Sequence, residues 1–259
     1  MKRLAVLLLL AFAMLSLPFG SAVREARSQN SSQATTAGEC SDFSYYGATG
    51  PIHWATLFPK SCAAKLQSPV DIINSTPTNT PAIELDYKST KLTVIRHHHA
   101  VQVNYDPGSS ISYGGATYNL EQFHFHLPGE HKIRNAGYVM EMHVVHRATN
   151  GSRAVIGVLF KAEGSDNAAY TPIVENLPPP GSEHGGTGPD INATTLLPAN
   201  RSYYRYAGSL TTPCCDEGVL WFVLADPVKI SSDQLRRFQI SQEGKHNSRP
   251  VQRRIRADK

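Results

Sequence analysis

The chain has 259 residues, of which 41% are hydrophobic and 18% charged, so it is long enough for one large core and too apolar for a disordered chain. Its 19 glycines and 17 prolines follow no collagen period, and a formal net charge of +4 is weak evidence for a nucleic-acid or other acidic partner. The unusual feature of the composition is its eleven histidines. They matter because histidine is the commonest metal ligand.

The N-terminus has the pattern of a secretory signal peptide. Lys2 and Arg3 precede an apolar run over residues 4–17, and small residues follow at 20–22. A membrane span needs about 20 apolar residues, so a transmembrane anchor is the weaker interpretation. We therefore predict a signal peptide over 1–22, a disordered polar leader over 23–39 and one folded domain over 40–259. The mature protein is expected to be secreted into an extracellular, periplasmic or organelle-lumen space, with no membrane anchor.

The body of the chain reads as strands separated by turn residues. Asp106-Pro107-Gly108 and Asn150-Gly151 are turn signals, the second typical of a short hairpin. The predicted strands span 91–105 (one or two strands), 117–126, 138–148, 153–163 and 218–225.

Two further segments complete the prediction. Residues 177–190 are rich in proline and glycine and are expected to form a long surface loop. One helix is predicted to begin after Ser231 or Ser232, with Asp233 in its first turn. The expected fold is mainly β (α+β): a single domain built on a large, mostly antiparallel, twisted central sheet with a few short peripheral helices.

Histidines alternate with phenylalanines on the strand predicted over 117–126. Residues i and i+2 of a strand project to the same face, so His124 and His126 lie on one side and Phe123 and Phe125 on the other. Two imidazoles so placed can reach one ion, although a strand His-x-His pair alone is more often not a metal site.

A second histidine-bearing strand follows over 138–148. His143 shares a face with Glu141 and Val145, whereas His146 lies on the opposite face. Two ligands from one strand and a third from its neighbour would hold zinc with an open fourth position, which is typical of catalytic sites. Composition and spacing do not choose between His143 and His146.

These segments resemble the alpha-class carbonic anhydrases, and the resemblance runs from about residue 45 to residue 254 with the motifs in family order. The matching segments are Gln122-Phe123-His124-Phe125-His126, Glu141-Met142-His143-Val144-Val145-His146, Gln67-Ser68-Pro69-Val70-Asp71-Ile72, Gly208-Ser209-Leu210-Thr211-Thr212-Pro213 and Asn247-Ser248-Arg249-Pro250.

The resemblance implies a Zn2+ site and a reaction. It places the zinc ligands on His124, His126 and His143, which leaves His146 a structural role. It pairs Gln122 with His124 and Glu141 with His143, and strand parity agrees, since each partner lies two positions before its ligand. The implied activity is reversible hydration of CO2 to bicarbonate and a proton by attack of a zinc hydroxide, with weak ester hydrolysis as a possible side reaction.

The resemblance also assigns the residues around the metal. Thr211 matches the threonine that accepts a hydrogen bond from the hydroxide, and Glu130 the carboxylate that accepts the Thr211 proton. Thr212 is expected to contact bicarbonate. An apolar wall for CO2 falls on Val145, Val155, Leu210, Val219 and Trp221.

A proton shuttle aligns with His99. If residues 97–99 were strand, His97 would share its face and His98 would not, so His97 is a hypothetical auxiliary relay and His98 a surface or packing residue. The aromatic residue expected beside this path is Tyr45 or Tyr46, which the sequence does not distinguish.

The departures from the family pattern concern cysteines and one rim residue. Secreted and bacterial relatives commonly bridge cysteines at positions matching Cys62 and Cys215, which leaves Cys40 and Cys214 to pair with each other or to bridge two chains. Glu121 stands where relatives often carry an apolar residue at the pocket rim. The sequence has Asn-x-Ser/Thr acceptor sites, which are compatible with a glycoprotein, at Asn30, Asn74, Asn150, Asn192 and Asn200.

Two non-enzymatic hypotheses compete with this one. A carbonic-anhydrase-like binding module would have lost a zinc ligand, and a zinc-sequestering or adhesive protein would bind metal without turnover. The expected partner is the small-molecule substrate, CO2 or bicarbonate, with no nucleic acid, and the protein is expected to be a monomer or homodimer.

Overall fold

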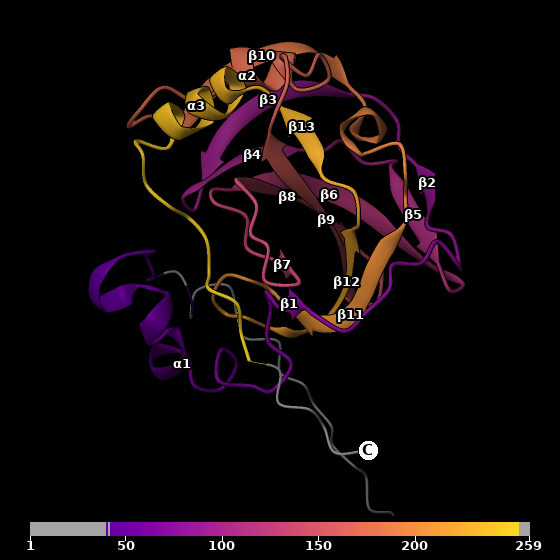
Figure 1. Cartoon of the computed structure of the whole chain (residues 1–259), viewed down its shortest axis with the longest axis vertical. Helices are drawn as coiled ribbons and strands as arrows, with labels where there is room; N and C mark the ends of the chain where they lie inside the picture. Colours follow the sequence, from indigo (N-terminus) through magenta and orange to yellow (C-terminus); the bar gives the residue numbers. More distant parts are fainter. Residues whose placement is uncertain (1–39, 41, 254–259) are drawn as a thin grey trace, which may run out of the picture. The chain divides into compact units, whose positions relative to one another are not determined.

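The computed structural model describes residue 40 and residues 42–253, and strands dominate this part of the chain (Figure 1). The strands are β1 (Asp71–Ile72), β2 (Glu84–Asp86), β3 (Thr90–His97), β4 (Ala100–Asn104), β5 (Ser110–Tyr113), β6 (Ala116–His126), β7 (Lys132–Ile133), β8 (Met140–Arg147), β9 (Arg153–Ala162), β10 (His184–Ile191), β11 (Tyr203–Ser209), β12 (Glu217–Leu224) and β13 (Val228–Ile230). The helices are α1 (Trp54–Leu57), α2 (Thr171–Glu175), α3 (Ser232–Ser241) and the 3-10 turns Gly47–Thr49, Pro51–His53 and Ala193–Leu196. The predicted signal peptide and leader lie outside the described residues.

One sheet organises the described residues. Eleven of their strands form it, in the order β10-β3-β4-β6-β8-β9-β12-β11, with β13 paired to β9, β5 paired to β6, and β2 paired to β5. Neighbours are antiparallel except that β12 and β13 run parallel to β9. The prediction of a single, mainly β domain with a mostly antiparallel sheet and a few short helices is therefore confirmed.

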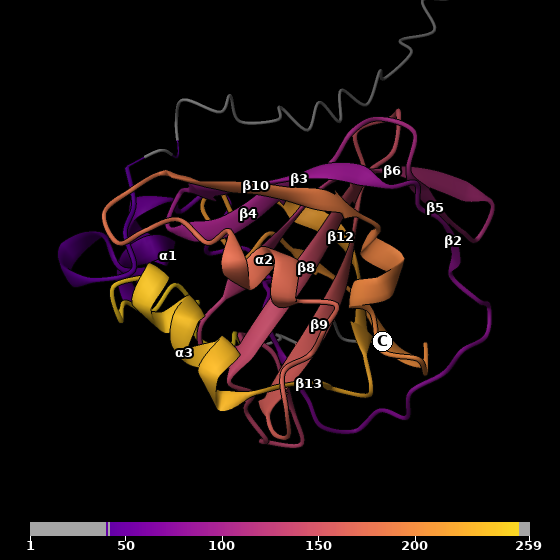
Figure 2. The same cartoon turned by 90° about the horizontal axis from the view of Figure 1, so that it is seen from above.

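The larger core lies on one face of this sheet. Phe123 and Phe125 of β6 are fully buried in it, as their alternation with histidines predicts. Ile173 of α2 and Phe238 of α3 bury their side chains in the same cluster, so these helices cover this face (Figures 1 and 2). With one face of β6 fixed by apolar burial, its histidines are forced to the other face.

The opposite face carries a smaller apolar cluster beside those histidines. Val145 of β8, Val155 of β9, and Val219 and Trp221 of β12 belong to it. The central strands β8, β9 and β12 are thus covered on both faces, which explains why most of their residues are buried.

Two local predictions are confirmed. Asn150 and Gly151 lie in the turn between the antiparallel strands β8 and β9, where Gly151 has a φ of +86°, a conformation that glycine adopts at no steric cost. Ser231 caps α3: its hydroxyl accepts a hydrogen bond from the Gln234 amide, and the Gln234 side-chain oxygen accepts one from the Ser231 amide.

The loop predicted over 177–190 is partly wrong. Its second half belongs to β10, which pairs antiparallel with β3 at the edge of the sheet. Glycines serve close approach here, because a Cβ on Gly186 would lie 2.2 Å from Asn176 Oδ1 and one on Gly185 would lie 2.3 Å from the Asn176 carbonyl oxygen. A glycine-rich edge strand with register shifts therefore has the composition of a loop.

The strand parity expected for the three consecutive histidines is also wrong. β3 ends at His97, which pairs with Ala100 of β4, and His98 and His99 form the two-residue turn between them. Their φ values are +44° and +73°, because the favoured two-residue hairpin turn needs left-handed backbone at both positions. His97 and His99 are therefore not neighbours on one strand face.

Two disulfides hold the N-terminal segment against the loop after β11. Cys62 is bonded to Cys215, and Cys40 is bonded to Cys214. Cys40 and Cys214 therefore form an intrachain bond and do not bridge two chains. Cys62 and Cys215 pack with the fully buried Trp54 in a third small core. Within the described residues, no helix is long and apolar enough to cross a membrane.

Candidate metal centre

Three imidazoles meet where β6 and β8 pair. His124 lies directly opposite His143 in the register, and His126 lies two residues further along β6 on the same face. Each ring offers one nitrogen, and these nitrogens lie within 4.8 Å of one another. His146 instead faces the larger core, where Tyr87 Oη lies 2.7 Å from its Nε2. The sheet register thus brings together the three histidines that the resemblance names.

Hydrogen bonds identify which nitrogen of each ring remains available. His124 Nδ1 donates to Gln122 Oε1 at 2.9 Å, and His126 Nδ1 donates to the Asn247 carbonyl oxygen at 2.7 Å. His143 differs, because its Nε2 donates to Glu141 Oε1 at 2.9 Å. The available atoms are therefore Nε2 of His124, Nε2 of His126 and Nδ1 of His143.

The first two of these atoms are only 3.1 Å apart. Since the proton of each neutral ring sits on its other nitrogen, both Nε2 atoms present lone pairs, which repel each other unless a cation lies between them. Burial lowers the pKa of His124, His126 and His143, which favours the neutral imidazole that binds metals. Three neutral imidazoles with converging lone pairs fit a zinc ion.

The Glu141 carboxylate accepts hydrogen bonds from groups around the candidate metal centre. Its Oε1 accepts from His143 Nε2 and, at 2.6 Å, from His131 Nδ1, while its Oε2 accepts from the Glu130 and His131 amides, each at 2.8 Å. Burial acts to raise the pKa of Glu141, but the charges and hydrogen bonds of His131 and His143 outweigh it and hold that pKa well below its usual range. Gly157 leaves room for this carboxylate, since a Cβ there would lie 3.1 Å from Glu141 Oε1.

A second buried carboxyl group, Glu130, lies beside the histidines. Its Oε1 accepts the Arg249 amide at 2.7 Å, and its Oε2 is buried with no hydrogen-bond partner among the described residues. Burial raises the pKa of Glu130 to about 7, against the opposing effects of His143, the Arg249 amide and the nearby Thr211 hydroxyl. Thr211 is itself buried. One acceptor of this carboxyl group therefore remains open close to Thr211.

The residues expected to form the apolar wall lie together in the structure. Val145, Val155, Val219 and Trp221 are buried in one cluster, and Leu210 packs on it partly exposed. The Trp221 ring lies 4.8 Å from that of His143, so this wall adjoins the imidazoles. Thr212 follows Leu210 and Thr211 in the same loop and is half-buried.

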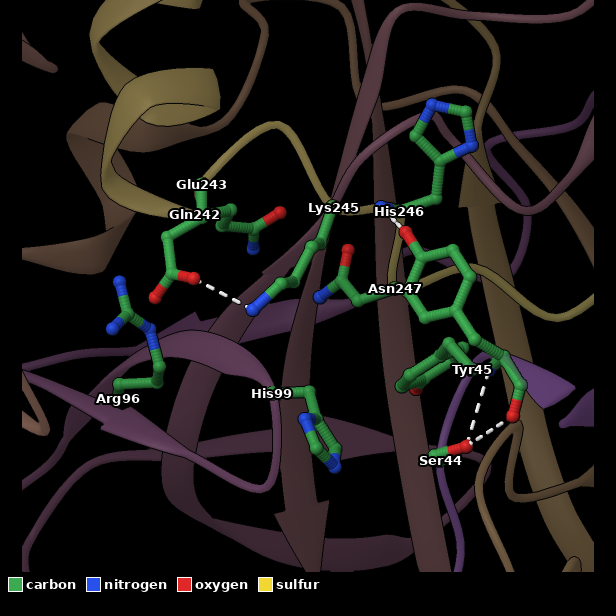
Figure 3. A pocket seen from close by; sticks show the side chains of 10 residues that line it. Ser44, Tyr45, Arg96, His99, Gln242, Glu243, Lys245, His246 and Asn247 are labelled. Atoms are coloured by element: carbon green, nitrogen blue, oxygen red, sulfur yellow. Dashed lines mark hydrogen bonds and ion pairs between the residues drawn. The ribbon is translucent and has the colours of Figure 1, made fainter. Parts of the chain in front are cut away.

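His99 lies outside this cluster and is exposed. Its ring is 5.9 Å from that of Tyr45, and both line a cavity between the β3–β4 turn and the segment 242–247 (Figure 3). Tyr46 is half exposed and its hydroxyl accepts the His246 amide, so of the two tyrosines Tyr45 is the one whose ring adjoins His99. His97 acts on the site through its charge, which contributes to lowering the pKa of His124 after burial and the other histidines.

Sequence reasoning missed two residues here. Asn247 holds His126 through its backbone carbonyl, which no side-chain pattern reveals, although the residue lies in a motif that the resemblance quotes. The second is His131, which is fully buried and joins Glu141 to the Tyr206 hydroxyl, which lies 2.5 Å from its Nε2. Its position directly after Glu130 was the available signal.

Comparisons with known proteins agree with this geometry. A family model described as eukaryotic-type carbonic anhydrase matches residues 49–258. A carbonic anhydrase of Neisseria gonorrhoeae is 38% identical over 223 residues, which cover 85% of this chain and 87% of that protein. The alpha-carbonic anhydrase of Thermovibrio ammonificans, solved with the inhibitor sulfanilamide, has a TM-score of 0.76 at 36% identity, covering 83% of this chain and 96% of that one. A hyperthermostable carbonic anhydrase from a hydrothermal vent chimney has a TM-score of 0.74 at 41% identity, covering 83% and 97%.

The sheet, the three-histidine cluster and these matches define one class of enzyme. The chain belongs to the eukaryotic-type, or alpha, carbonic anhydrase family, whose substrates are CO2 and bicarbonate.

Proposed function

We propose that this protein is a zinc-dependent catalyst of the reversible hydration of CO2, with His124, His126 and His143 as the zinc ligands. The observation that carries the proposal is the 3.1 Å approach of His124 Nε2 to His126 Nε2 while the other nitrogen of each ring donates to a protein acceptor. Zinc in such a site activates a water molecule by lowering its pKa.

The protein groups around the metal orient the reactants. Thr211 donates its hydroxyl proton to the open Glu130 oxygen, because a carboxylate can only accept, and the threonine oxygen is then left to accept a hydrogen bond from the attacking water. A dication at the imidazoles favours the ionised form of Glu130, against the effect of burial. The apolar wall that includes Val145 and Trp221 holds CO2 beside this point, and Thr212 contacts bicarbonate.

The proton leaves through His99. An imidazole accepts a proton from the site and releases it to solvent near neutral pH, and the exposed ring of His99 has access to solvent. Tyr45 borders the same space. His97, which ends β3 at the start of the same turn, is the auxiliary proton relay. Weak ester hydrolysis is a side activity of the same site.

The decisive test is CO2 hydration by the zinc-loaded mature protein, with zinc content and inhibition by a primary sulfonamide measured on the same sample. We expect one zinc per chain, sulfonamide-sensitive turnover, and loss of both zinc and turnover in His124→Ala. A zinc-loaded protein without hydratase activity would favour a metal-sequestering or binding role and would refute the catalytic proposal.

We further propose that residues 1–22 direct secretion and are removed, and that the folded domain spans 40–259. Two intrachain disulfides support an oxidising compartment. Of the described glycan acceptors, Asn74, Asn150 and Asn200 are exposed, whereas Asn192 is half-buried. Glycosylation at the first three is compatible with the fold.

A further inference from the structure

A cavity of ≈300 Å³ lies next to His99, outside the three-histidine cluster. Figure 3 shows it between the β3–β4 turn and the segment that follows α3. Its size is at the lower end for small-molecule sites. The polar side chains that matter for its chemistry are Arg96, His99, Gln242, Glu243 and Lys245.

The cavity has an excess of positive charge. The Glu243 carboxylate is already held by Lys245 Nζ at 2.6 Å and by the Gly181 amide at 2.8 Å. Arg96 donates to the backbone carbonyls of Ser182 and Ser241, and among the described residues no carboxylate lies within ion-pair distance of its guanidinium. Two cations therefore face one carboxylate, which favours a small anion.

Gln242 supplies an independent indication that the cavity binds a polar ligand. It lines the cavity and is 5% exposed, yet neither its Oε1 nor its Nε2 has a hydrogen-bond partner among the described residues. A buried amide without partners destabilises the folded protein, because its polar atoms have lost water and gained no hydrogen bond in return. The two polar atoms of the Gln242 amide need different partners, because Nε2 donates and Oε1 accepts. A ligand that satisfies both must carry an acceptor oxygen and a hydrogen-bond donor.

We propose that this cavity binds a small oxyanion that carries an exchangeable proton, of the phosphate or bicarbonate type, beside His99. Its negative charge lies near Arg96 and Lys245, one oxygen accepts from Gln242 Nε2, and its hydroxyl donates to Gln242 Oε1.

This inference rests on the proposed function, because it assigns the acceptor of the shuttled proton. The N–H bond of the His99 imidazolium breaks, an O–H bond forms on hydrogen phosphate, and neutral imidazole and dihydrogen phosphate remain. A bound buffer ion would take the proton directly from the ring, without a wait for diffusional encounter.

The test is a titration of the zinc-loaded, sulfonamide-blocked protein with inorganic phosphate, followed by NMR of the His99 ring and of ³¹P. The sulfonamide keeps the anion from the metal centre. We expect phosphate to shift the His99 signal, and we expect Gln242→Leu and Lys245→Gln each to weaken binding about tenfold, the equivalent of one charge-assisted hydrogen bond. A parallel arm with ¹³C-bicarbonate shows which ion displaces the other.

Lys229→Gln is the matched control. Lys229 pairs with Glu163 at 2.9 Å and is 62% exposed at its side chain, as Lys245 is 64% exposed beside Glu243, but it does not line the cavity. The control should bind phosphate as the wild type does. Because Gln242→Leu removes an unpaired buried amide, it should unfold at the same or a higher denaturant concentration, so lost binding would not reflect unfolding.

The inference is overturned if phosphate leaves the His99 signal in place, or if Gln242→Leu binds phosphate with wild-type affinity. Hydration measured separately in a buffer too bulky for the cavity reports on the proposed function alone. Absent hydration with intact phosphate binding would refute the proposed function and leave a plain anion site, whereas intact hydration without binding would refute only this inference.

Discussion

Glu141 accepts a hydrogen bond from His143 Nε2 at 2.9 Å, and this bond decides which nitrogen of that ring remains available at the candidate metal centre. His124 and His126 use Nδ1 for the corresponding contact and so present Nε2, whereas His143 presents Nδ1. The same Glu141 oxygen also accepts from His131, so the orientation of one ligand depends on a fully buried network.

Glu141→Gln should weaken zinc binding. The amide keeps the shape of the side chain but cannot accept hydrogen bonds at both of its terminal atoms, so His143 loses its fixed orientation and His131 its partner. We expect zinc affinity to fall by about 10- to 100-fold, measured by competition with a chelator. Glu163→Gln, at an exposed carboxylate paired with Lys229, serves as the control. Unchanged zinc affinity in Glu141→Gln would mean that the hydrogen bond does not orient the ligand.

Thr211→Val should lower kcat and leave zinc content intact. Valine keeps the buried volume of the threonine but offers no hydroxyl to the open Glu130 acceptor, so the attacking water loses its orientation. A reduction of about 100-fold is expected, the size of effect that misplacement of a reacting group produces. Wild-type turnover in this variant would reduce Thr211 to a loop residue.

His99→Ala should slow hydration at saturating CO2 in weak buffer, with kcat/KM little changed. The shuttle acts after the chemical step, so its loss is seen only when proton release limits turnover. His97→Ala, two residues earlier at the end of β3, is the matched comparison. Should His97→Ala slow turnover while His99→Ala does not, the assignment of the shuttle would have to be exchanged.

Sequence periodicity was sufficient to place His124 and His126 on one face of β6 but failed for the three consecutive histidines at 97–99. His124 and His126 alternate with buried phenylalanines. Burial of the phenylalanines on one face of the strand places both histidines on the other face. His97 to His99 have no such apolar partners, so nothing in the pattern shows that two of them form a turn. The loop predicted over 177–190 failed for a related reason, since glycines that allow close approach to Asn176 look like turn residues.

Other parts of the site have no local signal in the sequence. The choice of His143 over His146 follows from the register of β8 against β6 and from the buried contact between His146 and Tyr87. Asn247 contacts His126 through its backbone carbonyl oxygen, although the two residues are 121 positions apart in the sequence. Such long-range backbone contacts depend on the tertiary structure, and only a family resemblance can point to them beforehand.

The two disulfides should contribute unequally to stability. Cys62 and Cys215 are buried in a cluster with Trp54, whereas Cys40 and Cys214 are nearer the surface. Replacing both cysteines of the first pair by serine should lower the free energy of unfolding by about 2–5 kcal/mol, with a smaller loss for the second pair. Urea unfolding of the two double variants checks this. Equal losses would show that burial of the sulfur atoms does not add to the effect of the cross-link.

His146 should make the protein less stable as the pH falls. Burial lowers the pKa of His146 to about 3, against the opposing effect of hydrogen bonds to the Ala154 and Val144 backbone. An unfolded chain binds a proton at this histidine near pH 6.5, whereas the folded protein binds it only near pH 3. The stabilising effect of a neutral His146 is therefore fully present above the unfolded pKa and is lost progressively as pH falls between these values, by up to about 1.4 kcal/mol per pH unit.

His146→Gln removes this titration while it keeps a donor and an acceptor at the site. We expect the variant to be less stable than the wild type at pH 7, through imperfect packing, but its free energy of unfolding should fall less steeply between pH 6.5 and pH 4. Denaturant unfolding at several pH values gives both slopes, and protonation of the remaining histidines cancels in their difference. His53→Gln, on the N-terminal 3-10 turn and not buried, should keep the wild-type slope. If the His146→Gln and wild-type slopes coincide, His146 is not held neutral in the folded protein.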